Sequence, residues 1–326
     1  MKQVRSETIV WRFLDGRPGH ENQTIGLADA VARQISCTSF DVLVPREKRG
    51  MRFVVSSDFR RLRDLPVPDL MIGAGHATHV PLLAARARYG GFSTVIMKPT
   101  LPTALFDLCF IPVHDEVRSG RRNVILIEGA LNRMRPSVSQ DRSKGLILVG
   151  GPSRHFRWSN EKVIERIQTI LQNSLQSWSI VSSERTPPDF ESLCRARIPN
   201  AELITPVDRS RSWLPDQMAQ ASAVWVTCDS MSMMYESLTC GASLGLIELE
   251  PLNHGRIVRN VSRLIILGLA VCWSDWMEGL PLPAGRRPLC EAERCAALIL
   301  NRLDARRIPD SDASLDPHAS FVARAG

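Results

Sequence analysis

The sequence contains no apolar run that approaches the ~20 residues needed to cross a membrane. Its start, Met1–Val10 (MKQVRSETIV), lacks the apolar stretch of a secretory signal, so we expect a cytoplasmic location. The eight cysteines form no C-x-x-C pair, and the histidines are too dispersed to suggest a zinc site. We therefore expect reduced, mostly packed thiols without a disulfide framework.

Motifs of dinucleotide chemistry and of nucleic-acid binding are also missing. There is no G-x-G-x-x-G fingerprint, and no Y-x-x-x-K pair accompanies one, which disfavours a nucleotide-sugar epimerase. The chain has no RNA- or DNA-binding motif, and its basic residues are not interleaved with aromatic residues that would stack on bases. The sequence thus predicts no nucleic-acid partner.

The charge of the chain is unevenly distributed. Overall, 41 Lys and Arg exceed 34 Asp and Glu, which gives a net charge of +7. Up to Arg142 there are 21 basic and 14 acidic residues, whereas the remainder has 20 of each, so the whole excess lies in the N-terminal half. This distribution indicates that the N-terminal half meets an anionic partner. An acidic lipid or glycolipid fits a two-domain cytoplasmic enzyme best.

The segment Pro45–Arg63 holds seven basic residues and two acidic ones, with Met51, Phe53 and Phe59 interspersed among them. Basic residues mixed with exposed apolar ones are typical of a segment that lies on an anionic membrane surface. An ordinary surface helix, whose apolar residues turn inward, has the same pattern. Both interpretations stay open, and the first predicts a peripheral membrane protein.

Short apolar runs alternate with turns and helical patterns along most of the chain, which predicts an α/β protein with parallel sheets. A polar, proline-containing stretch at Asn132–Lys144 separates two such series. We therefore expect two doubly wound, Rossmann-like domains over residues 1–135 and 136–303, and a flexible polar tail over residues 304–326. The D-x-D string Asp310–Asp312 falls in this tail and is not expected to bind a metal.

The expected strands are Thr8–Phe13, Phe40–Val44, Asp69–Ile72, Thr94–Met97, Leu108–Ile111 and Val124–Ile127 in the first series, and Gly145–Val149, Trp178–Ser182, Glu202–Ile204, Ala223–Thr227 and Leu244–Ile247 in the second.

The stretch Ala223–Glu248 has the pattern strand, tight turn, helix, strand. Asp229 or Ser230 can cap the helix, and the free amides of its first turn can hold a phosphate near the hydroxyls of Ser230 and Ser232. Glu236 lies further along, where its carboxylate can accept hydrogen bonds from two ribose hydroxyls. The alternative is that Asp229 or Ser230 is only an N-cap and that Glu236 is only a solvated helix residue.

Other predicted strand ends also carry turns suited to ligands. Gly150-Gly151 can bring backbone amides against a phosphate, which Arg154 or Arg157 can neutralise. In the first series, a loop with two glycines and a proline ends at His20, whose imidazole is a credible proton acceptor, although it can equally pack inside the loop. His114 and Asp115 follow another strand, but neighbours on an extended segment face opposite ways.

Five strings of this sequence resemble the ELM1 family: DGRPGHENQ at residues 15–23, IGAG at 72–75, HD at 114–115, VGGPS at 149–153 and DSMSMMYE at 229–236. That family is named after a plant mitochondrial-fission factor and is similar in turn to the GT-B glycosyltransferases. The sequence departs from the family pattern at Glu184, where an arginine is usual, and at Ser212–Pro215, where an N-P-Y string is usual. The first departure removes one cation from the expected diphosphate site and leaves Arg185.

The resemblance implies a GT-B-like fold, in which two Rossmann-like domains face a cleft and the helix Cys290–Leu303 packs back across it. It implies a glycosyltransferase that moves a sugar from a nucleotide-sugar donor to an acidic acceptor, such as a lipid-linked or cell-envelope glycan. Such enzymes stabilise the leaving diphosphate with helix N-termini and cations, so neither a cofactor nor an essential metal is expected. The competing class is a non-catalytic nucleotide-binding scaffold of the same fold, as the name of the fission factor suggests.

The expected site then has two groups. The catalytic candidates are His20, Glu21, His114 and Asp115. The candidates for binding the nucleotide sugar are Gly19, Asn22, Gln23, Gly75, Gly150, Gly151, Ser153, Arg154, Arg185, Asp229, Ser230, Met231, Ser232 and Glu236.

Overall fold

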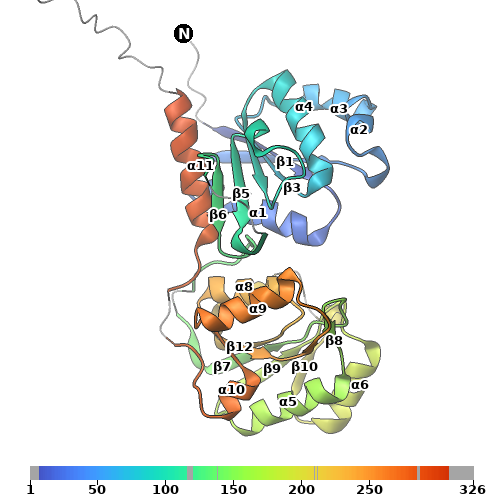
Figure 1. Cartoon of the computed structure of the whole chain (residues 1–326), viewed down its shortest axis with the longest axis vertical. Coiled ribbons are helices and arrows are strands. Elements are labelled where there is room, and N and C mark those ends of the chain that lie inside the picture. The colour runs from blue at the N-terminus through green and yellow to red at the C-terminus, as the bar shows by residue number, and fades with distance from the viewer. Residues whose placement is uncertain are drawn as a thin grey trace, which may run out of the picture.

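The computed structural model describes residues 7–115, 120–137, 139–208, 210, 212–284 and 287–307. The chain forms two α/β units, drawn one above the other in Figure 1, and each contains a six-stranded parallel sheet. The expected doubly wound, two-domain fold is confirmed. The D-x-D string Asp310–Asp312 and most of the predicted tail lie outside the described residues.

The first sheet consists of β1 (Thr8–Leu14), β2 (Cys37–Leu43), β3 (Leu70–Ala74), β4 (Phe92–Ile96), β5 (Leu108–Pro112) and β6 (Val124–Ile127), in the spatial order β2-β1-β3-β4-β5-β6. The helices of this part are α1 (Pro18–Ala32), α2 (Met51–Val54), α3 (Ser57–Arg61) and α4 (His79–Tyr89), with short 3-10 turns at η1 (Arg46–Lys48), η2 (Leu62–Asp64), η3 (His76–Thr78), η4 (Thr103–Leu105) and η5 (Val113–Asp115). The strands β3, β4 and β5 are buried along their whole length, as is usual for a parallel sheet with covered faces.

The second sheet consists of β7 (Asp141–Leu148), β9 (Ser177–Val181), β10 (Glu202–Ile204), β11 (Ala221–Thr227), β12 (Ser243–Ile247) and β14 (Ala270–Cys272), in the order β10-β9-β7-β11-β12-β14. Its helices are α5 (Asn160–Gln172), α6 (Pro188–Arg197), α7 (Trp213–Gln220), α8 (Met231–Cys240), α9 (Arg256–Ile266) and α10 (Trp273–Met277), and η6 (Pro206–Asp208) is a 3-10 turn. A small antiparallel pair, β8 (Phe156–Arg157) with β13 (Glu250–Pro251), lies outside the sheet. The sequence did not predict this pair or β14, whose strands have two or three residues each.

Both sheets reverse their direction of winding beside their first strand. The strand β1 lies between β2 and β3, and β7 lies between β9 and β11. Loops that leave two adjacent parallel strands toward opposite faces open a crevice at the carboxyl edge of the sheet, where ligands bind in such folds. The loops after β1, β3, β7 and β11 are therefore the places to look for a site.

The last helix, α11 (Glu291–Arg307), packs on the first sheet although it follows the second in sequence, and Figure 1 shows it along the upper unit. Its buried Cys295, Ile299 and Leu303 share a hydrophobic core with Leu27 and Val31 of α1. The expected division at residues 136–303 is thus corrected at its end, because α1 and not the second sheet covers the apolar face of this helix. The helix also continues to Arg307, past the predicted start of the tail.

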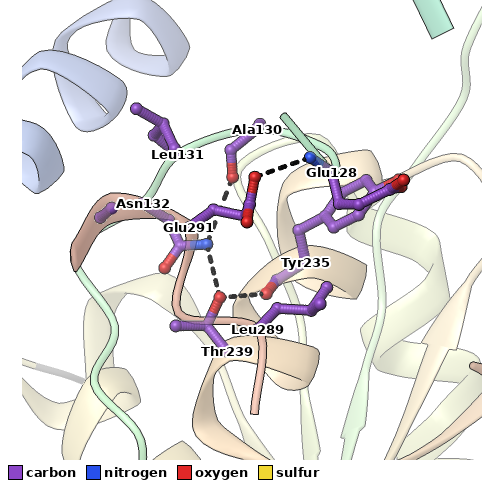
Figure 2. A pocket seen from close by; sticks show the side chains of 9 residues that line it. Glu128, Ala130, Leu131, Asn132, Tyr235, Thr239, Leu289 and Glu291 are labelled. Carbon is purple, nitrogen blue, oxygen red and sulfur yellow. Dashed lines mark hydrogen bonds between the residues drawn. The ribbon is translucent and has the colours of Figure 1, made fainter. Parts of the chain in front are cut away.

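The connection from β6 to β7 crosses the junction of the two units, and Figure 2 shows it against α8 and the start of α11. Asn132 Nδ2 donates to Thr239 Oγ1 at 3.1 Å, and Glu291 Oε2 accepts from the backbone N–H of Glu128 at 2.9 Å. The pocket between these groups has a volume of about 10 Å³, which is room for about one water. The junction is therefore closely packed and polar.

Candidate functional site

Three loops at the carboxyl edge of the second sheet are tied together at Gly150. Its backbone N–H donates to Thr227 Oγ1 at the end of β11, at 2.8 Å. Its carbonyl accepts from Thr186 Oγ1 at 2.6 Å and from Ser183 Oγ at 3.1 Å, both in the loop after β9. These bonds join the loops that follow β7, β9 and β11. The Gly150-Gly151 turn is therefore held rigidly at the crevice.

Asp229 lies at the centre of this arrangement, with a fully buried side chain. Its Oδ2 accepts from the backbone N–H of Gly151 at 3.0 Å and from the Arg185 guanidinium at 2.7 Å. Its Oδ1 is buried and has no hydrogen-bond partner within the described part of the chain. A Cβ at Gly150 would lie 2.2 Å from Oδ2, so only glycine lets the turn approach the carboxylate this closely. The buried carboxylate of Asp229 thus forms an ion pair with the half-exposed guanidinium of Arg185.

The N-terminus of α8 has no side-chain cap. Ser230 is the N-cap residue, yet its side chain accepts no capping hydrogen bond. Asp229 cannot take this role because its carboxylate faces Gly151 and Arg185. Ser230 therefore holds the N-cap position without capping the helix through its side chain, and Asp229 is not the cap. Among the residues that the structure describes, no side chain accepts from the backbone amides of the first turn, which leaves them available to an anionic ligand.

Glu236 connects this site to the first domain. It is buried, and its Oε1 accepts a hydrogen bond from Asn22 Nδ2 of α1 at 3.0 Å. Burial raises the pKa of Glu236, and the hydrogen bond from Asn22 acts in the opposite direction. The alternative in which Glu236 is a solvated helix residue is therefore wrong. Its carboxylate lies six residues into the stretch that begins at Ser230, at the contact between the two domains.

A histidine in the first turn of α1 contacts a carboxylate that directly follows β1. His20 Nδ1 lies 3.0 Å from Oδ2 of Asp15, which is buried at the end of β1. The other carboxylate oxygen, Oδ1, accepts from the backbone N–H of Arg17 at 3.2 Å. Gly75, at φ +82°, lies against the imidazole, and a Cβ there would be 2.3 Å from Nδ1. The carboxylate of Asp15 thus orients the imidazole of His20 through Nδ1. Nε2 is the ring nitrogen that Asp15 does not contact.

Asp15 was missed as a site residue in the sequence, although it is the first residue of the DGRPGHENQ string. The available signal was its position, because an acidic residue directly after a buried strand needs a partner. A second histidine nearby, His79, is buried. Burial, with smaller contributions from His76 and His20, lowers its pKa to about 4, so it is neutral near pH 7.

His114 and Asp115 do not form a hydrogen-bonded pair. His114 Nε2 is 3.9 Å from Asp115 Oδ1, beyond hydrogen-bond distance. The same oxygen of Asp115 is 2.5 Å from the Arg256 guanidinium of α9. Burial lowers the pKa of His114, and the charge of Asp115 opposes this shift. The structure gives Asp115 an ion pair between the domains, because Arg256 reaches it and the histidine does not.

The remaining candidates divide into residues used by the fold and residues left accessible. Gln23 is buried, and its Nε2 donates to its own helix at the carbonyl of Gly19, at 3.2 Å. Ser153 Oγ accepts from two backbone amides of its own turn, and Met231 Sδ accepts from Asn260 Nδ2 at 3.1 Å. Those left exposed or half-exposed are Gly19, Glu21, Arg154 and Ser232.

The predicted residues therefore gather at two places that touch. One place combines Gly150, Gly151, Arg185 and Asp229 with the N-terminus of α8. The other combines Asp15, His20 and Gly75, and the contact between Asn22 and Glu236 joins them. A separate pocket of about 320 Å³ lies between α5 and the β8–β13 pair, and Arg157 is among the residues that line it.

Within the described ranges, no three His, Cys, Asp or Glu side chains are placed to hold a metal ion. Nor does any described helix have the length and apolar character needed to span a membrane. Six of the eight cysteines are buried and all eight are free thiols, as expected.

The fold is shared with enzymes of nucleotide-sugar metabolism. A UDP-GlcNAc 2-epimerase from Methanocaldococcus jannaschii has a TM-score of 0.55 at 10% identity, covering 92% of this chain and 99% of that chain. A second UDP-N-acetylglucosamine 2-epimerase reaches 0.57 at 12% identity, covering 94% and 98%. Phytolacca americana UGT2, solved with UDP-2-fluoro-glucose and pterostilbene, gives 0.51 at 11% identity, covering 91% and 90%. At such identities the likeness establishes a GT-B-type fold.

No curated protein sequence is significantly similar to this chain. The model of the family described as Mitochondrial fission ELM1 matches residues 18–303. This match spans most of the 326 residues and includes every residue of the two places described above except Asp15, which precedes the matched range. The chain therefore belongs to the mitochondrial fission ELM1 family.

Proposed function

We propose that this protein is a glycosyltransferase that moves a sugar from a nucleotide-sugar donor to an acidic, lipid-linked or cell-envelope glycan acceptor at the cytoplasmic face of a membrane. The observation that carries the proposal is the Asn22–Glu236 contact. This contact supports the proposal because it joins α8, whose first turn we propose to bind the diphosphate, to α1, the helix that carries His20. Transfer needs these two functions next to each other.

The donor side of the proposal uses the second domain. The uncapped first turn of α8 offers backbone amides to the diphosphate, and Arg185 supplies a guanidinium close by. Arg185 already forms an ion pair with Asp229, so a diphosphate has to compete with that carboxylate. Arg185 therefore contributes less to diphosphate binding than an unpaired arginine would. This chemistry requires no metal ion, so binding is expected to survive EDTA.

Glu236 would accept hydrogen bonds from the ribose hydroxyls. Its carboxylate is buried where α1 and α8 meet, and Oε1 already accepts from the Asn22 amide, so ribose hydroxyls can reach it only if the two helices move apart. Donor binding would therefore be accompanied by a small separation of α1 from α8.

On the acceptor side, His20 would take the proton from the attacking hydroxyl. Asp15 holds the ring through Nδ1 and would stabilise the imidazolium that forms, which leaves Nε2 as the basic atom. Glu21, half-buried on the same turn of α1, is a second carboxylate within this region.

Epimerisation is the second candidate, because the two UDP-N-acetylglucosamine 2-epimerases compared above share this fold. The missing dehydrogenase-type fingerprint therefore does not argue against it. NMR of UDP-GlcNAc mixed with the enzyme separates the candidates: an epimerase changes the configuration of the sugar without an acceptor, whereas a transferase leaves the sugar intact until an acceptor is added. A nucleotide-binding scaffold would bind but show neither reaction.

The donor half is tested by calorimetry with UDP, GDP, ADP, TDP and CMP, each with and without EDTA. The proposal expects one nucleoside diphosphate to bind with the same affinity under both conditions. Absence of binding to all five, or binding that needs a divalent ion, would contradict it.

A further inference from the structure

The segment Pro45–Arg63 folds into two short helices with a buried inner face. Phe53 of α2 is 1% exposed and Phe59 of α3 is 8% exposed, and their rings meet edge to face at 6.1 Å. Neither ring can reach a partner, so these two phenylalanines are not the exposed apolar residues that the membrane-surface interpretation requires. The inner face follows the pattern of an ordinary surface helix.

Apolar side chains are also exposed in this part of the chain. Met51 is the first residue of α2, and Val55 directly follows its last residue, one turn further on; they are 63% and 71% exposed. Leu43, at the end of β2, is 65% exposed. An ordinary surface helix would place polar side chains at such positions. Together with the basic residues described next, these three make up the α2–α3 surface.

Unpaired positive charge surrounds the exposed apolar residues. Lys48 is neutralised by Asp58 at 2.8 Å, and Arg63 lies 3.5 Å from Asp64. Four further arginines are exposed and form no ion pair among the residues that the structure describes: Arg46, Arg52, Arg60 and Arg61. Figure 1 places α2 and α3 at the end of the upper unit that is remote from α11, so the surface is not covered by the last helix.

We propose that the α2–α3 surface docks on an anionic phospholipid bilayer. Arginines would contact headgroup phosphates, while Leu43, Met51 and Val55 would enter the boundary between headgroups and acyl chains. Nucleic acid fits less well, because the aromatic rings of this segment are buried and cannot stack on bases. The inference rests on the proposed function only in expecting the acceptor to be lipid-linked. The surface belongs to the domain that holds His20.

Binding of this kind is reversible and sensitive to salt. Each arginine contributes modestly, and screening acts over ~8 Å at physiological ionic strength. Losing four arginines should therefore weaken partitioning by up to on the order of 1000-fold at low salt. The three apolar residues should leave a weaker component that persists in high salt.

The full-length protein can be tested by co-sedimentation with phosphatidylcholine vesicles that contain increasing fractions of phosphatidylglycerol, at low and high salt. The test variant changes Arg46, Arg52, Arg60 and Arg61 to Ser. The matched control removes the same charge elsewhere, by changing the exposed Arg121, Arg122, Arg195 and Arg197 to Ser. A third variant, Met51→Ser with Val55→Ser, probes the salt-resistant component. Circular dichroism confirms that each variant is folded.

The proposal expects the test variant to lose the anionic-lipid dependence while the control retains it. It is overturned if wild type and test variant sediment equally, if the control loses as much binding as the test variant, or if the surface retains RNA in a gel-shift assay but ignores vesicles. Nucleotide calorimetry on the same variants keeps the two proposals apart, because a variant that binds nucleotide but not vesicles affects only the docking inference.

Discussion

Asn22 on α1 and Glu236 on α8 meet across the domain junction, with 3.0 Å between Nδ2 and Oε1. The carboxylate of Glu236, which is proposed to bind the ribose, is buried here and is not exposed to solvent. Donor affinity should consequently depend on how easily the two helices separate. The first two predictions follow from this pair.

Glu236→Gln should weaken binding of the nucleoside diphosphate by about 1–3 kcal/mol, because a neutral amide accepts ribose hydrogen bonds less strongly than a carboxylate. Glutamine can still accept from Asn22, so the domain contact should survive. Calorimetry measures the affinity, and unchanged binding would show that Glu236 serves only the junction.

The same variant should change the pH dependence of stability. Burial raises the folded-state pKa of Glu236, so between the ordinary carboxyl pKa and this raised value the folded protein binds more protons than the unfolded chain. The contribution of Glu236 to the free energy of unfolding should then fall as pH rises through this window. Glu236→Gln removes the titration, and urea unfolding of both proteins between pH 4 and pH 8 should show wild type losing stability relative to the variant. If the unfolding free energies of the two proteins changed in parallel with pH, burial would not raise the pKa of Glu236 in solution.

His20→Ala should lower turnover by about 10²- to 10⁴-fold, the usual contribution of a general base, without changing nucleotide affinity. Asp15→Asn should lower it in the same direction, because the ring would lose the carboxylate that orients Nδ1. The exposed His76 offers a nearby control, since His76→Ala removes an imidazole that makes no contact with Asp15. If all three variants turn over the donor at the wild-type rate, His20 is a packing residue of its loop.

Gly150→Ala should destabilise the protein by about 1–3 kcal/mol and abolish nucleotide binding, because the new Cβ meets both buried oxygens of Asp229 and the loops around it cannot yield. Gly19→Ala is the matched comparison, as nothing lies within 4 Å of a Cβ at that position. Thermal unfolding and calorimetry measure the two effects. Equal behaviour of the two variants would rule out the tight approach of Gly150 to Asp229.

The fold was largely readable from the sequence, because buried parallel strands give apolar runs and their ends carry glycine and polar residues. The central strands from Leu70 to Pro112 were found for this reason, whereas β14 and the β8–β13 pair are too short to give a periodic signal. Site residues could be predicted from the sequence only where they lie directly after a predicted strand. That Asp229 would turn from its helix toward Gly151, or that Asn22 would meet Glu236, 214 residues away, depends on contacts that no local pattern encodes.

Because α11 packs on the first sheet, no single division of the chain separates the two units. The apolar face of α1 remains uncovered until residues 291–307 have been synthesised, so the first unit cannot complete its core while the ribosome is still translating the second. A fragment that ends near residue 135 should expose Leu27 and Val31 and aggregate. Joined to α11 by a short linker, the same fragment has the partners it needs to fold alone.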